Sequence, residues 1–351
     1  MQEHTVQRLV VIRPDNKLGE TLLATPVLRA LREALPDAYI EAWFGRRWTQ
    51  MVDGSPYVNR VRGVPFRPRG HEFWRLLAEL RRIRAEACLI LRPDTYGYTL
   101  MARWAGMPIR AGMVEKRALL KKPLTHIAPL DTRMHQVERN LAVAEVVMGR
   151  TLSRPPLAFT PSSHVSLTPS VAEKLTSAYA VLHLGTGGVQ PRWLPERFAR
   201  VADYLAERYR LLPVLSGAPD DTALGIQCAQ AMRYRAVNLV GQLSVLDLAA
   251  VLRDARLLVS VDTGVVHLAA ALQKPCVSLY FRNDYPAHQW YPWQVPHVAV
   301  SASRHCSQCS PARCRSERLD CVDSIAAEHV CEATDQLMQV LSTIIYSTTE
   351  A

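Results

Sequence analysis

Residues 259–271 read VSVDTGVVHLAAA, and this stretch decides the fold class. A β-branched run ends in Asp262-Thr263-Gly264 and passes directly into a helix of small apolar residues. A strand that feeds a helix through a tight turn is the unit from which parallel, helix-covered sheets are built. The amides of Thr263, Gly264 and Val265 are expected at the amino end of that helix, a position that suits a diphosphate. The alternative interpretation is a capping Asp262 in a tight turn without a ligand.

The same alternation extends along the chain in both directions. Downstream of residue 170, apolar patterns predict strands at 180–184, 211–215, 257–261 and 276–280, and helices at 195–208, 245–253, 265–272 and 324–345. Upstream, they predict strands at 9–13, 38–44 and 87–91, and helices at 21–34 and 72–84. The Pro-, Ser- and Thr-rich segment 153–169 is typical of a linker. We therefore predict an α/β protein with two doubly wound domains, residues 1–160 and 170–351, and a ligand cleft at the carboxyl ends of their strands.

The composition is that of a globular protein with an uneven charge. The chain has 351 residues, of which 48% are hydrophobic, and a net charge of +10. No apolar run reaches the roughly 18 residues of a membrane-spanning helix, and residues 9–12 are too short for a secretion signal, so we expect a cytoplasmic protein. Residues 1–160 hold 26 Lys and Arg against 15 Asp and Glu (+11), whereas residues 161–351 hold 16 against 17 (-1). The first half is therefore expected to meet an anionic partner.

The loop after the first predicted strand reads RPDNKLGETLLATP, residues 13–26. Gly19 has no Cβ, which lets backbone amides approach a ligand where the loop becomes a helix. Glu20 follows at the amino end of that helix, where the dipole favours a carboxylate, and it suits a general base. The alternative is a helix-capping acid without a catalytic role.

A second glycine-rich turn follows the strand predicted at 180–184. It contains Thr186 and Gly187, and Arg192 precedes the next helix, which is a weak phosphate-site pattern. The pattern is neither a Walker A motif nor a G-x-G-x-x-G fingerprint, so kinases and dinucleotide-dependent dehydrogenases are disfavoured.

Together these segments resemble glycosyltransferase family 9, the ADP-heptose:lipopolysaccharide heptosyltransferases. The resemblance runs in order through residues 13–26, 135–141, 193–198, 216–221, 238–244, 262–271 and 290–292. It implies a GT-B fold, in which two Rossmann-like domains face a central cleft, with the acceptor on the first domain and the ADP-sugar on the second. It also implies inverting transfer without a catalytic metal, in which a carboxylate deprotonates the acceptor hydroxyl as ADP leaves.

The motifs and the resemblance together assign the site residues, with Glu20 as the general base. The implied donor contacts are Thr186, Gly187, Arg192, Asp220, Asp262, Thr263, Gly264, His267 and Arg282, and the implied acceptor contacts are Arg13, Lys17, Arg67 and Arg69. The chain departs from the family pattern at Glu20, where Asp is usual, at Pro191, where Lys is usual, and at Phe281, near a usual glycine. Arg192 and Arg282 would supply the positive charge for the diphosphate, although Arg282 also fits a solvated surface arginine.

Four cysteines form a separate cluster within the segment 305–331. Cys306, Cys309, Cys314 and Cys321 have the spacing C-x2-C-x4-C-x6-C. In a cytosolic protein such a cluster favours a tetrahedral zinc or iron site over disulfides. The metal would be structural, because four thiolates leave no open position, and the alternative is a set of free thiols.

The basic first half also interleaves arginines with aromatic residues. Arginines at positions 67, 69, 75, 81, 82 and 84 surround Phe66, Phe73 and Trp74. This surface suits an anionic glycan or glycolipid acceptor and peripheral contact with the inner face of the cell membrane. Nucleic acid would suit it too, but no nucleic-acid motif is present.

Three functions remain open on the sequence. The first is transfer of heptose from ADP-heptose to a lipopolysaccharide core-like glycan. The second is an enzyme of the same fold with another nucleotide sugar or a protein acceptor, which the changes at Pro191 and Phe281 and the cysteines motivate. The third is a glycan-binding protein that has lost turnover.

Overall fold

The computed structural model describes residues 6–93, 95–114, 123–187, 191–282, 286–305 and 320–349, with side chains through residue 343. The chain divides into two compact units, Met1–His164 and Val165–Ala351. The division falls inside the segment 153–169 that is rich in Pro, Ser and Thr. None of the described helices combines the length and the hydropathy that crossing a membrane requires.

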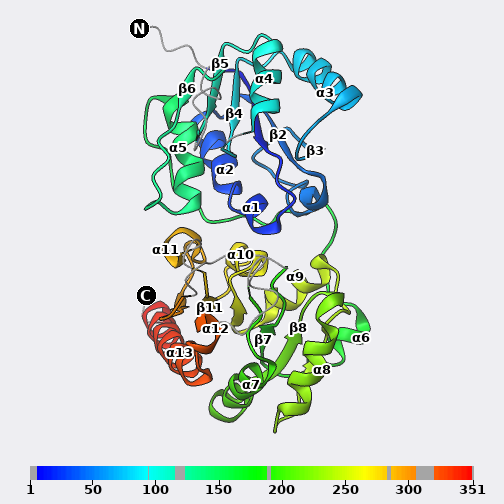
Figure 1. The fold of residues 1–351 in the computed structure, drawn as a ribbon, viewed down its shortest axis with the longest axis vertical. Helices are drawn as coiled ribbons and strands as arrows, with labels where there is room; N and C mark the ends of the chain where they lie inside the picture. The colour runs from blue at the N-terminus through cyan, green and yellow to red at the C-terminus, as the bar shows by residue number, and fades with distance from the viewer. Residues whose placement is uncertain are drawn as a thin grey trace. The chain divides into compact units, whose positions relative to one another are not determined.

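The first unit contains a six-stranded parallel sheet in the order β3-β2-β1-β4-β5-β6 (Figure 1). Its strands are β1 (Arg8–Arg13), β2 (Tyr39–Gly45), β3 (Arg60–Val64), β4 (Ala87–Ile90), β5 (Ile109–Gly112) and β6 (His126–Ile127). Its helices are α1 (Leu18–Leu22), α2 (Thr25–Ala34), the 3-10 helix η1 (Arg46–Met51), α3 (Gly70–Ile83), α4 (Tyr96–Trp104) and α5 (Gln136–Met148). Apolar residues of α3 and α4 share one core cluster with β1 and β4, and α2 packs with α5.

The second unit repeats this plan with the order β12-β11-β10-β7-β8-β9. Its strands are β7 (Tyr179–His183), β8 (Leu212–Ser216), β9 (Val237–Asn238), β10 (Leu258–Val261), β11 (Cys276–Tyr280) and β12 (His297–Ser301). Its helices are α6 (Pro169–Ala172), α7 (Pro195–Tyr209), η3 (Pro219–Asp221), α8 (Thr222–Ala231), α9 (Val245–Asp254), α10 (Gly264–Ala271), α11 (Ala287–Trp290), α12 (Asp320–Asp323) and α13 (Ala327–Thr349). The prediction of an α/β protein with two doubly wound sheets is confirmed.

The helix predicted at 21–34 is wrong in one respect, because the structure divides this region into α1 and α2. Pro26 has no N–H to donate to the carbonyl of Leu22 and would clash with it in a continuous helix. The hydroxyl of Thr25 donates to that carbonyl instead, at 2.6 Å. Glu20 therefore lies in a five-residue helix of its own, as the third residue of α1.

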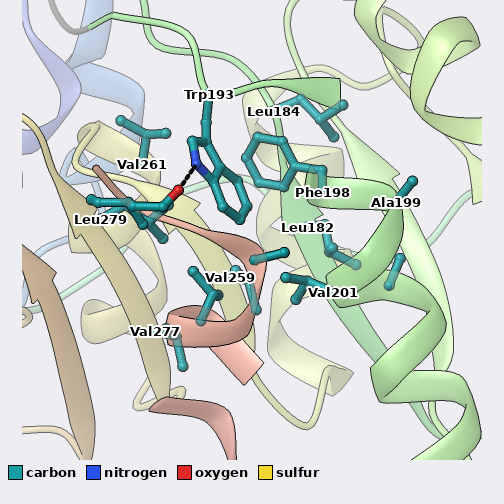
Figure 2. Packing of buried hydrophobic residues seen from close by; sticks show 14 of the residues in the cluster. Leu182, Leu184, Trp193, Phe198, Ala199, Val201, Val259, Val261, Val277 and Leu279 are labelled. Carbon is teal, nitrogen blue, oxygen red and sulfur yellow. Dashed lines mark hydrogen bonds between the residues drawn. The ribbon is translucent and has the colours of Figure 1, made fainter. Parts of the chain in front are cut away.

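The core of the second unit is organised around Trp193, just before α7 (Figure 2). The indole is 1% exposed, packs edge-on against Phe198 with ring centroids 4.8 Å apart, and donates its N–H to the carbonyl of Ile325 at 3.0 Å. Arg197 donates to the carbonyls of Val322 and Ile325 at 2.6 and 2.8 Å. The closing helix predicted from 324 begins only at Ala327, and just before it the amide of Ala326 donates to His329 Nδ1 at 3.2 Å.

Candidate functional site

In each unit some of the predicted site residues follow the strands between which the strand order reverses. The reversal falls between β1 and β4 in the first unit and between β7 and β10 in the second. At such a point the connections from neighbouring strands lead to opposite faces of the sheet and leave a crevice outside the carboxyl ends. The loop of Arg13 and Glu20 follows β1, Thr186 follows β7, and Asp262 follows β10.

Arg13 joins four parts of the first unit at the carboxyl end of β1. Its Nε lies 2.7 Å from Asp15, and its Nη1 donates to the carbonyl of Leu91 at 2.6 Å and to Asn140 Oδ1 at 3.1 Å. Its Nη2 forms an ion pair with the carboxylate of Glu20. With only 2% of Arg13 exposed, the structure places this predicted acceptor contact inside the protein, where it holds Glu20.

The protonation of Arg13 agrees with this role. Burial opposes its charged form, but the negative charges of Glu20 and Asp15 outweigh burial and raise the pKa of the Arg13 guanidinium. Arg13 therefore stays cationic at every working pH.

Asn140 of α5 supports the same cluster from the other side. Its side-chain amide donates to the carbonyl of Leu23 at 2.9 Å, and its oxygen also accepts from Gln136 at 3.3 Å. Asn140 is fully buried and Glu20 is 8% exposed. The end of α1 is thus tied to α5, which limits the movement of the Glu20 carboxylate.

Arg67 connects to this cluster through an aromatic ring. Asp15 forms a second ion pair with Arg92, which follows β4. The guanidinium carbon of Arg92 lies 4.7 Å from the centroid of Phe66, and that of Arg67 lies 5.2 Å from the same ring. Both distances are those of cation–π contacts. Arg67, which is exposed at the carboxyl edge of the sheet, is therefore linked through Phe66 and Arg92 to Asp15.

The two other predicted acceptor contacts occupy helix starts. Lys17 is exposed and is the N-cap of α1, where its carbonyl accepts from the amide of Thr21 at 3.2 Å. Arg69 is exposed and is the N-cap of α3. Both lie in segments that follow the carboxyl ends of strands of the same sheet, β1 and β3.

In the second unit the α10 turn differs in detail from its prediction. Thr263, and not Asp262, is the N-cap of α10, and its hydroxyl accepts from the amide of Val265 at 3.3 Å. That amide, expected to face an anion, is therefore bonded within the turn. Gly264 begins the helix, and His267 is buried in its first turns at 3% exposure.

A buried histidine and aspartate support the turn that holds Thr186 and Gly187. His183 Nδ1 lies 3.1 Å from Ser216 Oγ, and burial, opposed by the charge of Asp221, lowers the pKa of His183 to about 4. A Cβ at Gly185 would lie 2.3 Å from the Asp221 carboxylate. Only glycine therefore fits between that carboxylate and the turn.

The acid that pairs with Arg192 is Asp221, which neighbours the predicted donor contact Asp220. Arg192 Nη2 lies 2.9 Å from Asp221 Oδ1, and Asp221 Oδ2 accepts from the amide of Ala218 at 3.0 Å. Asp220 is exposed, whereas Asp221 is 4% exposed. Arg192 itself is half exposed, so one face of its guanidinium remains open to solvent.

Tyr280 is the last residue of β11, and Arg282 follows it at the carboxyl end of the second sheet. Arg282 is 5% exposed directly after β11, so it is not a solvated surface arginine. The hydroxyl of Tyr280 donates to the carbonyl of Trp290 at 3.1 Å, and the rings of Trp290 and His267 lie 6.5 Å apart. Burial, with the charge of Asp262, raises the pKa of Tyr280 and keeps it a neutral donor.

Most of the predicted metal cluster lies outside the residues that the structure describes. Cys306, Cys309 and Cys314 lie outside the described residues. Cys321 is buried in α12 within the core of the second unit, at 3% exposure. In the part of the chain that the structure describes, no three His, Cys, Asp or Glu side chains are grouped as metal ligands.

The sequence did not reveal the residues that hold the candidate site side chains in place. Asp15, Arg92, His183 and Asp221 are polar residues at or just after strand ends or at helix starts, whereas Asn140 lies inside α5. The one available signal was a polar residue inside an otherwise apolar helix, as at Asn140, because such a residue needs a buried partner.

Comparison with known proteins gives the class of the chain. A crystal structure of a glycosyl transferase family 9 protein from Veillonella parvula has a TM-score of 0.75 and 22% identity, covering 95% of this chain and 97% of that one. E. coli heptosyltransferase WaaC, solved with ADP-2-deoxy-2-fluoro heptose, has a TM-score of 0.68 and 19% identity, covering 94% and 99%. Together with the two doubly wound sheets, these likenesses show the GT-B fold.

The family follows from the sequence match. Residues 73–320 match glycosyltransferase family 9 (heptosyltransferase), and the chain belongs to this family. Lipopolysaccharide heptosyltransferase 3 of E. coli K12 is 25% identical over 343 residues, which covers 91% of this chain and 95% of the relative.

Proposed function

We propose that this enzyme transfers a heptose from ADP-heptose to an anionic glycan acceptor of the lipopolysaccharide core type, with inversion at the anomeric carbon. The donor proposal is supported by family membership and by the ADP-heptose analogue named for a protein of the same fold. The acceptor proposal is supported by the named activity of the heptosyltransferase relative and by the +11 charge of residues 1–160, where 26 basic residues stand against 15 acidic ones.

The observation that carries the proposal is the held carboxylate of Glu20. Inverting transfer needs one base that removes the proton of the acceptor hydroxyl while the oxygen attacks the anomeric carbon. The bond from that carbon to the diphosphate breaks, and ADP leaves. Glu20 is fixed by Arg13, and Arg13 is fixed by Asp15, Leu91 and Asn140. A base oriented by a buried network is ready for reaction without reorganisation.

The second unit supplies groups that suit the leaving diphosphate. Arg192 is half exposed and held by Asp221, and Arg282 is buried after β11. The start of α10 and the turn at Thr186 and Gly187 add backbone donors at the same sheet edge. Cations and oriented amides there would stabilise the charge that develops as ADP departs.

The test is a donor screen with the purified chain. Calorimetry and product analysis with ADP-heptose, ADP-glucose, UDP-glucose and GDP-mannose should show binding and transfer for the ADP-sugars and preference for the heptose. Tight binding of a UDP- or GDP-sugar without ADP-heptose binding would overturn the donor assignment.

A second function uses the same fold with a different donor or a protein acceptor. The ion pair between Arg192 and Asp221, beside Pro191, favours this function, because Asp221 offsets part of the positive charge that Arg192 would offer to the donor phosphate. The donor screen, repeated with protein acceptors, separates the two functions.

Two further properties belong to the proposal. The segment 305–331 would bind a structural zinc or iron through Cys306, Cys309, Cys314 and Cys321, which elemental analysis of the purified chain tests. The enzyme would act in the cytoplasm at the inner face of the cell membrane, where a lipid-linked acceptor is found, and cell fractionation tests this location.

A further inference from the structure

The flank of the first unit formed by α3 and α4 exposes two tryptophans. Trp74 is 60% and Trp104 is 44% exposed, and their rings stack with centroids 5.9 Å apart and an interplanar angle of 12°. Phe73 contacts both rings edge-on, at 5.5 and 5.7 Å, and packs against the core of the unit. The two indoles are thus held rigidly outward, at the flank where Figure 1 shows α3 beside α4.

The spacing of residues along α3 explains this exposure. Trp74, Ala78, Arg81 and Arg82 follow one another at four-, three- and one-residue intervals and share the outer face of the helix. Leu76, Leu77 and Leu80 lie on the opposite face and are buried. α3 is therefore amphipathic, but its outer face carries a tryptophan and two arginines in place of the usual mixed polar residues.

An arginine-lined hollow adjoins the tryptophans. Arg8, Arg81, Arg82 and Arg84 line it together with Ile83, and its volume is about 490 Å³. Arg81 also donates to the carbonyl of Trp104, from Nε at 3.3 Å and Nη2 at 3.1 Å. The hollow and the indole pair are therefore one continuous surface, which we call the α3–α4 face.

The α3–α4 face keeps an excess of positive charge. The two acids of α3 are engaged: Glu72 pairs with Arg46 and Arg75, and Glu79 pairs with Arg62. The ion pairs of these two acids do not include the arginines of the hollow, although Glu41 and Glu79 line a neighbouring hollow together with Arg8 and Arg82. Basic side chains outnumber acidic ones in both hollows, so the face attracts anions.

The hollow is separate from the candidate catalytic residues. Arg8 begins β1 and Arg13 ends it, so the two lie about 17 Å apart along a parallel strand. The hollow is thus at the amino edge of the sheet, whereas Glu20 follows the carboxyl edge. α3 spans about 21 Å between these edges, from the acceptor candidate Arg69 to the hollow.

We propose that the α3–α4 face docks the enzyme on the surface of a bilayer that contains anionic phospholipid. The two indoles enter the headgroup region, where tryptophan is favoured because its ring is apolar and its N–H is polar. The arginines contact the lipid phosphates, and each basic side chain near an anionic surface strengthens binding. Exposed, stacked tryptophans beside an arginine-lined hollow are the observations that select a lipid surface as the occupant.

This proposal rests on the membrane location proposed above and names the surface that would provide it, and it can fail independently of the transfer reaction. Binding to vesicles requires neither donor nor acceptor, and the donor screen requires no membrane. The experiment measures co-sedimentation of the full chain with vesicles of phosphatidylcholine alone and of phosphatidylcholine with phosphatidylglycerol. Binding is expected only with phosphatidylglycerol and should weaken as salt is added.

Two sets of variants assign the binding to this face. The double variant Arg81→Gln, Arg82→Gln should bind anionic vesicles about 30-fold more weakly. Trp74→Ala should lose the blue shift of tryptophan emission on binding and the quenching by brominated acyl chains that the wild type shows. The matched control Arg208→Gln, Arg235→Gln removes the same charge from exposed positions of the second unit and should bind as the wild type does.

Circular dichroism confirms that each variant is folded, and all the substituted side chains are exposed. Equal binding to neutral vesicles, or unchanged binding by the Arg81 and Arg82 double variant, would overturn the proposal. So would saturable binding of single-stranded oligonucleotides, or salt-sensitive self-association, without any binding to vesicles.

Discussion

Replacing Arg13 by lysine separates the geometry of the buried cluster from its charge. The guanidinium contacts Asp15, Glu20, the carbonyl of Leu91 and Asn140 through three different nitrogens. A lysine ammonium has a single nitrogen and cannot reach the same four groups at once. Arg13→Lys therefore keeps the cation but releases at least two of the contacts.

The loss of stability follows from the buried hydrogen-bonding groups that Arg13→Lys leaves without a partner. A buried hydrogen bond to a charged group is worth about 1.5–3 kcal/mol, so losing two costs the first unit about 3–6 kcal/mol of unfolding free energy. For a unit of this size the loss corresponds to a melting temperature lower by roughly 10 °C. A shift of the Glu20 carboxylate by about 1 Å should lower kcat about 100-fold.

Calorimetry, steady-state transfer and ADP binding test this prediction together. The transition of the first unit should shift, kcat should fall, and the affinity for ADP should stay unchanged, because ADP is assigned to the second unit. Arg62→Lys is the matched control: Arg62 is a partly exposed arginine of the same sheet, paired with Glu79, and its substitution should cost less than about 1 kcal/mol. A wild-type melting temperature in Arg13→Lys, or a loss of ADP affinity equal to the loss of kcat, would refute the reasoning.

Two predictions concern the second unit. His183 is neutral in the folded state down to a pKa of about 4, below its ordinary 6.5, so the unfolded chain takes up the proton first as the pH falls. Stability is therefore complete above about pH 6.5 and is lost toward pH 4, by about 2 kcal/mol between pH 7 and pH 5; urea unfolding should show this loss in the wild type and not in His183→Asn. Gly185→Ala should displace the Asp221 carboxylate, which would lie 2.3 Å from the new methyl group, and weaken ADP binding by calorimetry at least tenfold. Gly97→Ala, whose methyl group would meet nothing closer than 3.9 Å, should leave ADP binding unchanged.

The sequence predicted the central strands well, because they are short apolar runs buried on both faces. The strand at 276–280 matches β11 residue for residue, and the helix predicted at 245–253 matches α9, which Ser244 caps by accepting from the amide of Asp247 at 3.2 Å. The outer strands β6 and β9 are only two residues long, and β3 is half polar, so hydrophobic pattern could not detect them. Pro26 indicates the break between α1 and α2, but the helical spacing of the apolar residues around it predicts one continuous helix.

The sequence predicted which loops carry the candidate site residues, but not which groups those residues contact. Glycine turns at strand ends correctly located the loops of Glu20, Thr186 and Asp262. The sequence could not show that Arg13 is turned inward, because that depends on Asn140, 127 residues away, and on the carbonyl of Leu91. Nor could it distinguish Asp220 from Asp221, since only the fold decides which of two adjacent carboxylates is buried beside Arg192.

The central claim is that Glu20 is the base for transfer, and Glu20→Gln tests it most directly. The amide cannot accept the proton of the acceptor hydroxyl, but it leaves the second unit untouched. We predict that Glu20→Gln binds ADP-heptose with wild-type affinity and shows no transfer in a single-turnover assay, while Glu20→Asp retains activity. Transfer by Glu20→Gln at the wild-type rate would contradict the account.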